Sequence, residues 1–117
     1  MEKMAVLVSA DLMLASQIEG DCRAVGLTLV TANSSNCLDQ AKNAGWVFWD
    51  LQASVVPSAA VVTELHASDG CLVVALGPHV DEAKLQLARD AGCDLVLPRG
   101  RFVRELSQIL KNDGSVS

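Results

Sequence analysis

The chain has no tyrosine, and its 117 residues include only two tryptophans and two phenylalanines. Because half of the residues are nonetheless hydrophobic, the core has to be built mainly from Val, Leu, Ile and Ala. That composition is typical of an α/β protein with Val- and Leu-rich strands and Ala- and Leu-rich helices. A chain of this length can bury a core without disulfides or metals. We therefore expect one domain over residues 1–117, with a core at 4–110 and a polar C-terminal tail at 112–117.

Basic residues are also scarce. The sequence has nine Lys and Arg and fourteen Asp and Glu, which gives a net charge of −5 and a pI of about 4.8. Domains that bind nucleic acid usually carry a basic stripe, so nucleic acid is not expected as a partner. The cysteines show no C-x-x-C spacing and no histidine at a ligand-like interval, so a zinc site has little support. We expect all four to be small buried hydrophobic residues in a reducing cytoplasm: Cys22, Cys37, Cys71 and Cys93.

Long hydrophobic runs are missing as well. No segment approaches the length of a transmembrane helix. Met1 to Met4 leads into only a short apolar run, without the hydrophobic region or the cleavage site of a signal peptide. We expect a cytoplasmic protein that has no membrane partner.

Four glycines lie between a helix-like segment and an apolar run: Gly26, Gly45, Gly70 and Gly92. Glycine just after a helix adopts the left-handed conformation that ends it, so each position predicts a helix followed by a strand. Expected strands are 4–8, 27–31, 46–50, 71–76 and 94–97. Alternating strands and helices with short loops predict a flavodoxin-like (βα)5 three-layer sandwich, whose parallel sheet has the order 2-1-3-4-5.

Apolar residues recur at helical spacing in the connecting segments. They are Leu14, Ile18, Cys22 and Val25; Leu38, Ala41 and Ala44; Ala60, Val61 and Leu65 after Pro57 in a first turn; Leu85 and Ala88 after the cap Asp81; and Phe102, Leu106, Ile109 and Leu110 after a break at Pro98–Arg101.

The stretch Trp46-Val47-Phe48-Trp49 has no polar face, which predicts a strand buried on both sides. Phe48 and Trp49 should point to opposite faces of the sheet. Asp50 ends this strand, at the edge where open α/β sheets bind ligands, so it is the first candidate for a functional residue. The predicted strand order brings it close to Asp11, which follows the first strand. Simpler alternatives are a solvated carboxylate for Asp50 and a helix N-cap for Asp11.

With these elements in place, the chain resembles the receiver domains of response regulators from Met4 to about Leu110. The matching segments are Val6 to Asp11, Val47 to Asp50, Asp81 to Gly92 and Asp94 to Arg99. The resemblance implies a two-component signalling role. In that family an acidic pair after strand one and the aspartate ending strand three bind Mg²⁺, and that aspartate accepts a phosphoryl group from a histidine kinase. A Thr or Ser ending strand four and a Lys ending strand five contact the phosphoryl group.

Residue by residue, the match to that site is partial. Asp50 fits the phosphoacceptor and Asp11 the second member of the acidic pair, but the first member is Ala10. The hydroxyl position falls at Leu76 or Gly77, which cannot donate. Arg99 takes the place of the lysine as the candidate phosphate contact. Asp11, Asp50 and the backbone carbonyl of Gln52 could hold Mg²⁺, with weakened affinity because one ligand is lost at Ala10.

We therefore predict an atypical receiver-like (pseudo-receiver) signalling domain, not an enzyme, that acts through contacts with a histidine kinase or an output protein. A homodimer through residues 81–110 is another expectation, and Arg99, Arg101 and Arg104 form a cationic cluster there that is either a docking face or an ordinary solvated face. The alternatives are a Mg²⁺-dependent phosphoacceptor modified on Asp50 and a flavodoxin-like domain that binds a small ligand.

Against the small-ligand alternative, the turn after the first strand lacks a glycine-rich phosphate loop. Ser9 lacks a G-x-S-x-G elbow, so a hydrolase is not supported. His66 and His79 accompany no nucleophile pattern.

Overall fold

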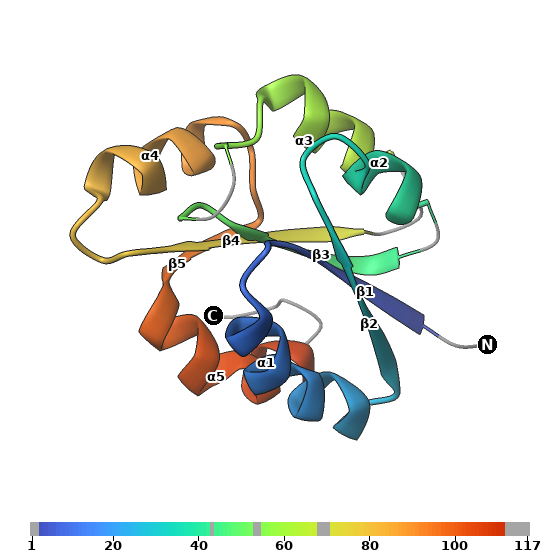
Figure 1. Ribbon diagram of the computed structural model, residues 1–117. Coiled ribbons are helices and arrows are strands. Elements are labelled where there is room, and N and C mark those ends of the chain that lie inside the picture. The colour runs from blue at the N-terminus through green and yellow to red at the C-terminus, as the bar shows by residue number, and fades with distance from the viewer. Residues whose placement is uncertain (1–2, 43, 53–54, 68–70, 112–117) are drawn as a thin grey trace.

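The computed structural model describes residues 3–42, 44–52, 55–67 and 71–111. Its five strands form one parallel sheet of order β2-β1-β3-β4-β5, which confirms the predicted flavodoxin-like topology (Figure 1). The strands are β1 Lys3–Val8, β2 Leu27–Ala32, β3 Ala44–Asp50, β4 Leu72–Gly77 and β5 Leu95–Pro98. The helices are α1 Leu12–Ala24, α2 Cys37–Gln40, α3 Ala59–His66, α4 Glu82–Asp90 and α5 Arg99–Lys111.

Helices cover both faces of the sheet, with α1 and α5 on one side and α2, α3 and α4 on the other (Figure 1). Each face has its own hydrophobic core. Trp49 belongs to the core under α2, α3 and α4, and Phe48 to the core under α1 and α5, as the alternation of strand side chains predicts. Phe48 packs edge-on against Phe102 of α5, with ring centroids 5.3 Å apart. The central strand is therefore buried on both sides.

Three helices begin at side chains that cap them. Asp11, Ser58 and Asp81 accept hydrogen bonds from backbone N–H groups in the first turns of α1, α3 and α4. Asp81 was expected in this role. Pro57 precedes the cap of α3, so its expected place in the first turn of that helix is wrong by two residues.

The predicted glycine stops are confirmed at two positions. Gly26 and Gly92 have φ angles of 81° and 99°, which place them in the left-handed region after α1 and α4. The helix end predicted at Gly45 is wrong, because Gly45 lies inside β3. Met4 pairs with Ala44 and Ala5 with Trp46, so Gly45 is the extra residue at a shift in register between β1 and β3. Gly70 lies outside the described residues.

Other predictions need smaller corrections. Ala44 belongs to β3, because α2 is only four residues long. Val25 is 39% exposed at the end of α1. In α3 the buried residues are Val62 and Leu65, while the expected Ala60 is exposed, because the face that carries Val62 and Leu65 packs on the sheet. The stripe of α5 is buried as predicted, but Arg99 follows β5 directly and starts the helix without the expected break.

The cysteines are all free thiols, and Cys22, Cys37 and Cys71 are buried as expected, whereas Cys93 is partly exposed. Burial raises the pKa of Cys22, Cys71 and Cys93 to about 11. Thiols with such pKa values stay protonated at neutral pH and are poor nucleophiles. Within the described ranges, no helix is long and apolar enough to cross a membrane, and the tail at 112–117 falls outside them.

Candidate functional site

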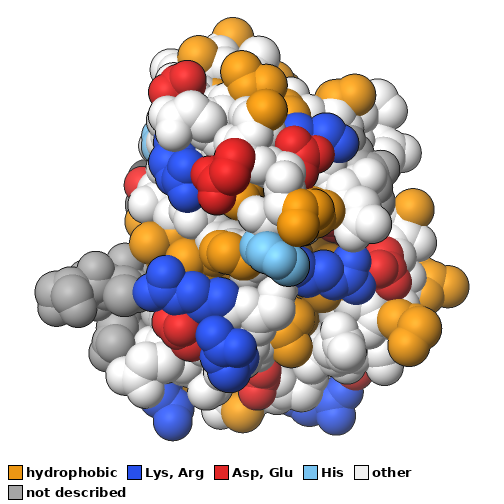
Figure 2. Space-filling model, turned by 90° about the vertical axis from the view of Figure 1, so that its left-hand side faces the viewer, with side chains coloured by type: hydrophobic (Ala, Val, Ile, Leu, Met, Phe, Trp, Pro, Cys, Tyr) orange, Lys and Arg blue, Asp and Glu red, His pale blue; other side chains and the backbone are white. Residues whose placement is uncertain are grey.

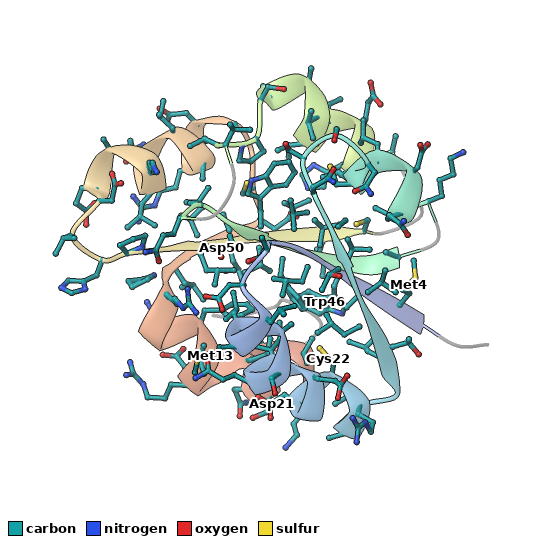
Figure 3. All side chains as sticks on the ribbon, viewed as in Figure 1. Met4, Met13, Asp21, Cys22, Trp46 and Asp50 are labelled. Carbon is teal, nitrogen blue, oxygen red and sulfur yellow. The ribbon has the colours of Figure 1, made fainter. Side chains whose placement is uncertain are left out.

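Asp50 lies at the carboxyl end of β3, where Figure 3 shows it at the level of the sheet above the first turn of α1. Its exposed fraction is 0%. The Ser9 hydroxyl donates a hydrogen bond of 2.7 Å to Oδ2 of Asp50. The backbone N–H of Gln52 donates one of 3.0 Å to Oδ1. Both oxygens of this buried carboxylate therefore have a donor, which a buried charged group requires.

The strand register explains why Ser9 meets Asp50. Val8 pairs with Trp49 across β1 and β3, so the next residue on each strand lies side by side. Ser9 is held there by its own backbone N–H, which donates to the carbonyl of Ala32 at 3.1 Å. Its hydroxyl also accepts a hydrogen bond of 3.0 Å from the N–H of Asp11. Ser9 is only 7% exposed and is fixed in position by these contacts.

Asp11 has two structural tasks. Oδ1 accepts hydrogen bonds from the N–H groups of Met13 and Leu14, at 3.0 and 3.1 Å, and so caps α1. Oδ2 accepts a hydrogen bond of 2.6 Å from the guanidinium of Arg99, and the two side chains form an ion pair. The Arg99 hydrogen bond, followed by that from Leu14, lowers the pKa of Asp11 below its ordinary value of 3.8. The N-cap alternative for Asp11 is therefore confirmed.

The predicted site residues do gather at one edge of the sheet, but their connections differ from the expected ones. Asp50 is linked to Asp11 through Ser9, and Asp11 is linked in turn to Arg99. Arg99 is thus already paired with a carboxylate. Gln52 contributes its backbone N–H to Asp50.

In this arrangement the domain itself engages every carboxylate oxygen that the expected Mg²⁺ site would use, which is compatible with the weakened affinity that the sequence predicted. Each of the four carboxylate oxygens of Asp11 and Asp50 already accepts a hydrogen bond. The guanidinium of Arg99 lies on one of those oxygens, and its positive charge opposes a metal ion. The described part of the chain also contains no cluster of three or more His, Cys, Asp or Glu residues that could hold a metal.

The end of β4 carries no hydroxyl side chain. Leu76 is fully buried, and a Cβ added to Gly77 would come within 3.2 Å of Cβ of Leu51. A residue larger than glycine at position 77 would therefore require Leu51, the neighbour of Asp50, to shift by a few tenths of an ångström.

Two residues of this edge escaped the sequence analysis. Ser9 was considered only as a hydrolase nucleophile, although a polar residue directly after β1 and the predicted strand order together place it beside Asp50. Lys84 of α4 reaches the backbone carbonyl of Leu51 at 3.4 Å and lies 3.9 Å from Asp81. The contact of Lys84 with Asp81 could be predicted from their spacing of three residues at the start of a helix. The contact with Leu51 has no such signal in the sequence.

Figure 2 looks onto the side of the molecule where the strands end, and it shows acidic and basic side chains interleaved rather than one basic patch. Two of the arginines near the start of α5 are paired, Arg99 with Asp11 and Arg101 with Glu105. Three apolar side chains that follow the ends of β1 and β4 are 74–79% exposed: Leu12, Met13 and Val80. This surface therefore combines apolar side chains with balanced charge.

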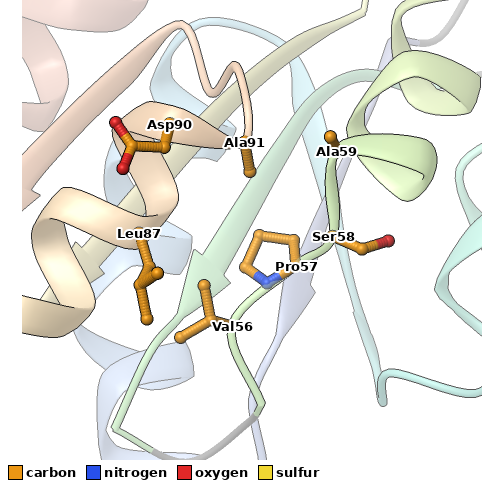
Figure 4. Close-up of a pocket in the computed structure, with 7 residues that line it drawn as sticks. All are labelled: Val56, Pro57, Ser58, Ala59, Leu87, Asp90 and Ala91. Carbon is orange, nitrogen blue, oxygen red and sulfur yellow. The ribbon is translucent and has the colours of Figure 1, made fainter.

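A shallow groove of about 380 Å³ lies elsewhere, between the start of α3 and α4 (Figure 4). Its walls are mainly apolar, with Val56, Pro57 and Leu87 among them, and Ser58 and Asp90 at its margin. None of the predicted site residues lines it. The groove and the Asp50 site are separate features.

Several solved structures share the fold of this chain. The sequence matches no protein-family model and no curated protein. Among solved structures, a response regulator from Thermotoga maritima is 13% identical, with a TM-score of 0.74 over 99% of this chain and 100% of that one. The receiver domain of a sensor histidine kinase from Pseudomonas aeruginosa, with magnesium in its active-site cleft, is 18% identical, with a TM-score of 0.75 over 98% and 100%.

A receiver-domain protein from Clostridium thermocellum is 17% identical, with a TM-score of 0.71 over 96% of this chain and 94% of that one. These likenesses define the class of the molecule as a flavodoxin-like α/β sandwich. Within that class the chain has the fold of response-regulator receiver domains, as the resemblance in the sequence predicted.

Proposed function

We propose that this chain is an atypical receiver-like signalling domain that acts through protein contacts and does not depend on phosphorylation of Asp50. The observation that supports this most strongly is the state of the Asp50 carboxylate. It has no exposed surface, and both oxygens accept hydrogen bonds from within the domain. A phosphodonor has no access to it in this arrangement.

The chemistry of phosphoryl transfer supports the same proposal. Transfer to a carboxylate needs an accessible nucleophile and positive charge beside the equatorial oxygens of the phosphoryl group. Arg99 is the nearest match to a phosphate contact, but it is held by Asp11. A phosphoryl group on Oδ2 of Asp50 would displace the Ser9 hydrogen bond, and a contact from Arg99 to that group would require breaking the ion pair with Asp11. In the alternative, a Mg²⁺-dependent phosphoacceptor, binding of the cation and the phosphoryl group has to offset the free energy of both losses.

The contact face is proposed to lie within residues 81–110, at α4, β5 and the start of α5. Leu87 is 54% exposed on α4 and offers an apolar side chain to a partner at this face. Arg104 is exposed and makes no ion pair with another described residue. A histidine kinase, an output protein or a second copy of the chain are the classes of partner that the receiver resemblance implies.

We further propose that residues 1–117 work as a single domain and a signalling module rather than an enzyme. The four free thiols support a reducing compartment, and we place the domain in the cytoplasm. The small-ligand alternative gains no support at the Asp50 edge, where the polar groups are already satisfied by one another.

The test is a Mg²⁺ titration followed by the backbone amide signals of Ser9, Asp50 and Gln52 in NMR spectra. We expect only small, linear shifts, equal to those of an Asp50→Asn variant. Saturable shifts that the variant lacks would mean that a cation displaces the Ser9 hydrogen bond, and the phosphoacceptor alternative would then replace this proposal.

A further inference from the structure

The strand β2 forms one edge of the sheet, and in Figure 1 it runs from the end of α1 up to α2. The N–H of Ser9 donates to the carbonyl of Ala32, so the backbone groups of Ala32 point toward β1. Because these groups alternate along a strand, those of Leu29 and Thr31 point away from the sheet. They have no hydrogen-bond partner within the part of the chain that the structure describes.

This edge lacks the features that usually keep a strand edge from pairing. The sequence of β2 is LTLVTA, with no charged residue, no proline and no glycine. The opposite edge strand, β5, has only four residues and ends in Pro98, which has no N–H to donate. Thr28 and Thr31 are exposed, and Leu29 and Val30 are only partly buried. β2 is thus an open and chemically uniform edge.

The charge pattern favours a second copy of the chain as the partner for this edge. Residues 24–38, which include β2 and both flanking turns, form the longest segment of the sequence without a charged side chain. In a twofold contact the residue on the axis meets its own copy and the flanking residues meet others of the same segment, so charges of one sign on that segment would repel each other. A neutral segment avoids that repulsion and offers nothing to attract a charged partner.

We propose that β2 pairs with β2 of a second copy, antiparallel and around a twofold axis at Leu29, to form one continuous sheet. In this register Leu29 faces Leu29, and Leu27 faces Thr31 on either side. Each of these pairs exchanges two backbone hydrogen bonds. Thr28 and Val30 then face each other on the side of the sheet that carries α2.

The contact is narrow, because one strand and its neighbouring side chains contribute to it. Interfaces smaller than about 1,200 Å² in total are typical of weak, transient association. The dimer is therefore a concentration-dependent species that forms in the micromolar-to-millimolar range. It is also closed, since the twofold uses up both β2 edges and leaves only the short β5 edges free.

The experiment is sedimentation equilibrium of the full chain over increasing concentration. The wild-type mass rises from the 12.3 kDa of the monomer toward twice that value. Thr31→Pro removes an N–H that faces outward and leaves the pairing with β1 intact, so the variant remains monomeric. Leu12→Lys alters an exposed apolar residue of α1, outside both β2 and the contact face proposed above, and leaves the dimer unchanged. Circular dichroism checks that both variants are folded.

A charge exchange at the twofold axis gives a second test, which does not depend on how well the proline variant folds. Leu29→Lys and Leu29→Glu are each monomeric, because like charges face each other at the axis. An equal mixture of the two forms a dimer again. A wild-type chain that stays monomeric at about 1 mM, or a dimer abolished by Leu12→Lys but not by Thr31→Pro, overturns the proposal. The proposal is also overturned if the mixture of Leu29→Lys and Leu29→Glu fails to associate. Binding of an unrelated extended peptide in place of a second copy would overturn it as well.

Discussion

The hydroxyl of Ser9 and the carboxylate of Asp50 form a hydrogen bond of 2.7 Å across the ends of β1 and β3. Both residues are buried, and the N–H of Asp11 donates to the same hydroxyl. Ser9 therefore connects the backbone of Asp11 to the carboxylate of Asp50, and it supplies a donor to that buried carboxylate.

Ser9→Ala should destabilise the domain. The substitution leaves Oδ2 of a fully buried carboxylate without a donor, which costs about 1–3 kcal/mol in the free energy of unfolding. Urea denaturation measures it. Ser107→Ala, at an exposed position of α5, is the matched control and should change stability by less than about 0.5 kcal/mol. Equal effects of the two substitutions would show that the Ser9 hydrogen bond contributes nothing.

Ser9→Asp should make stability depend on Mg²⁺. The new carboxylate lies beside that of Asp50, and the two like charges repel each other when no cation is bound. A bound cation removes the repulsion, and binding at a hundredfold excess over the dissociation constant stabilises by about 2.7 kcal/mol. Thermal unfolding with and without Mg²⁺ should show an increase in Tm for this variant only. A similar increase in wild-type protein or in Ser107→Asp would contradict the assignment of Ser9.

The ion pair of Arg99 with Asp11 should give a pH-dependent contribution to stability. The pKa of Asp11 is lowered in the folded protein, so the contribution is fully present above the ordinary value of 3.8 and is lost as the pH falls through the lower folded value. Arg99→Gln should therefore lower the urea midpoint at pH 7, and its difference from wild type should shrink toward zero in strong acid.

Asp11→Asn provides the complementary variant, because asparagine caps a helix about as well as aspartate but cannot form the ion pair. Its urea midpoint at pH 7 should resemble that of Arg99→Gln. If the difference between Arg99→Gln and wild type were the same at every pH, the ion pair would not be its cause.

The two tryptophans of β3 should differ in their response to substitution by phenylalanine. The indole N–H of Trp49 donates to the carbonyl of Val55 at 2.7 Å and so fastens the segment after β3. Trp46 is buried to a similar extent but makes no such hydrogen bond with the described residues. Trp49→Phe should lower the free energy of unfolding by about 0.5–1.5 kcal/mol more than Trp46→Phe, as measured in urea. If both substitutions lowered the free energy of unfolding equally, the loss would come from the smaller side-chain volume and not from the hydrogen bond of Trp49.

Much of the fold could be predicted because the signals were local. Gly26 and Gly92 end helices through their own backbone conformation, and Asp81 caps the helix that follows it. Gly45 has the same kind of neighbours in the sequence, but the pairing of β3 with β1 determines its conformation. A register shift between strands far apart in the chain leaves no local signal.

The site was harder to predict for the same reason. Asp50 and Asp11 could be placed at one edge from the strand order, yet the partner of each depended on how side chains pack there. The burial of Asp50 and the pairing of Arg99 with Asp11 involve segments 41 and 88 residues apart. The strand order places Ser9 near Asp50, but the hydrogen bond between them depends on the register of β1 with β3.

The most direct measurement is the intact mass of the protein after incubation with acetyl phosphate and Mg²⁺, beside an Asp50→Asn control. The Asp50 carboxylate is buried and hydrogen-bonded at both oxygens. We therefore predict that incubation changes neither the mass of the wild-type protein nor that of the control. A gain of one phosphoryl group in wild type that the control lacks would show that Asp50 is a working phosphoacceptor and would contradict the proposed function.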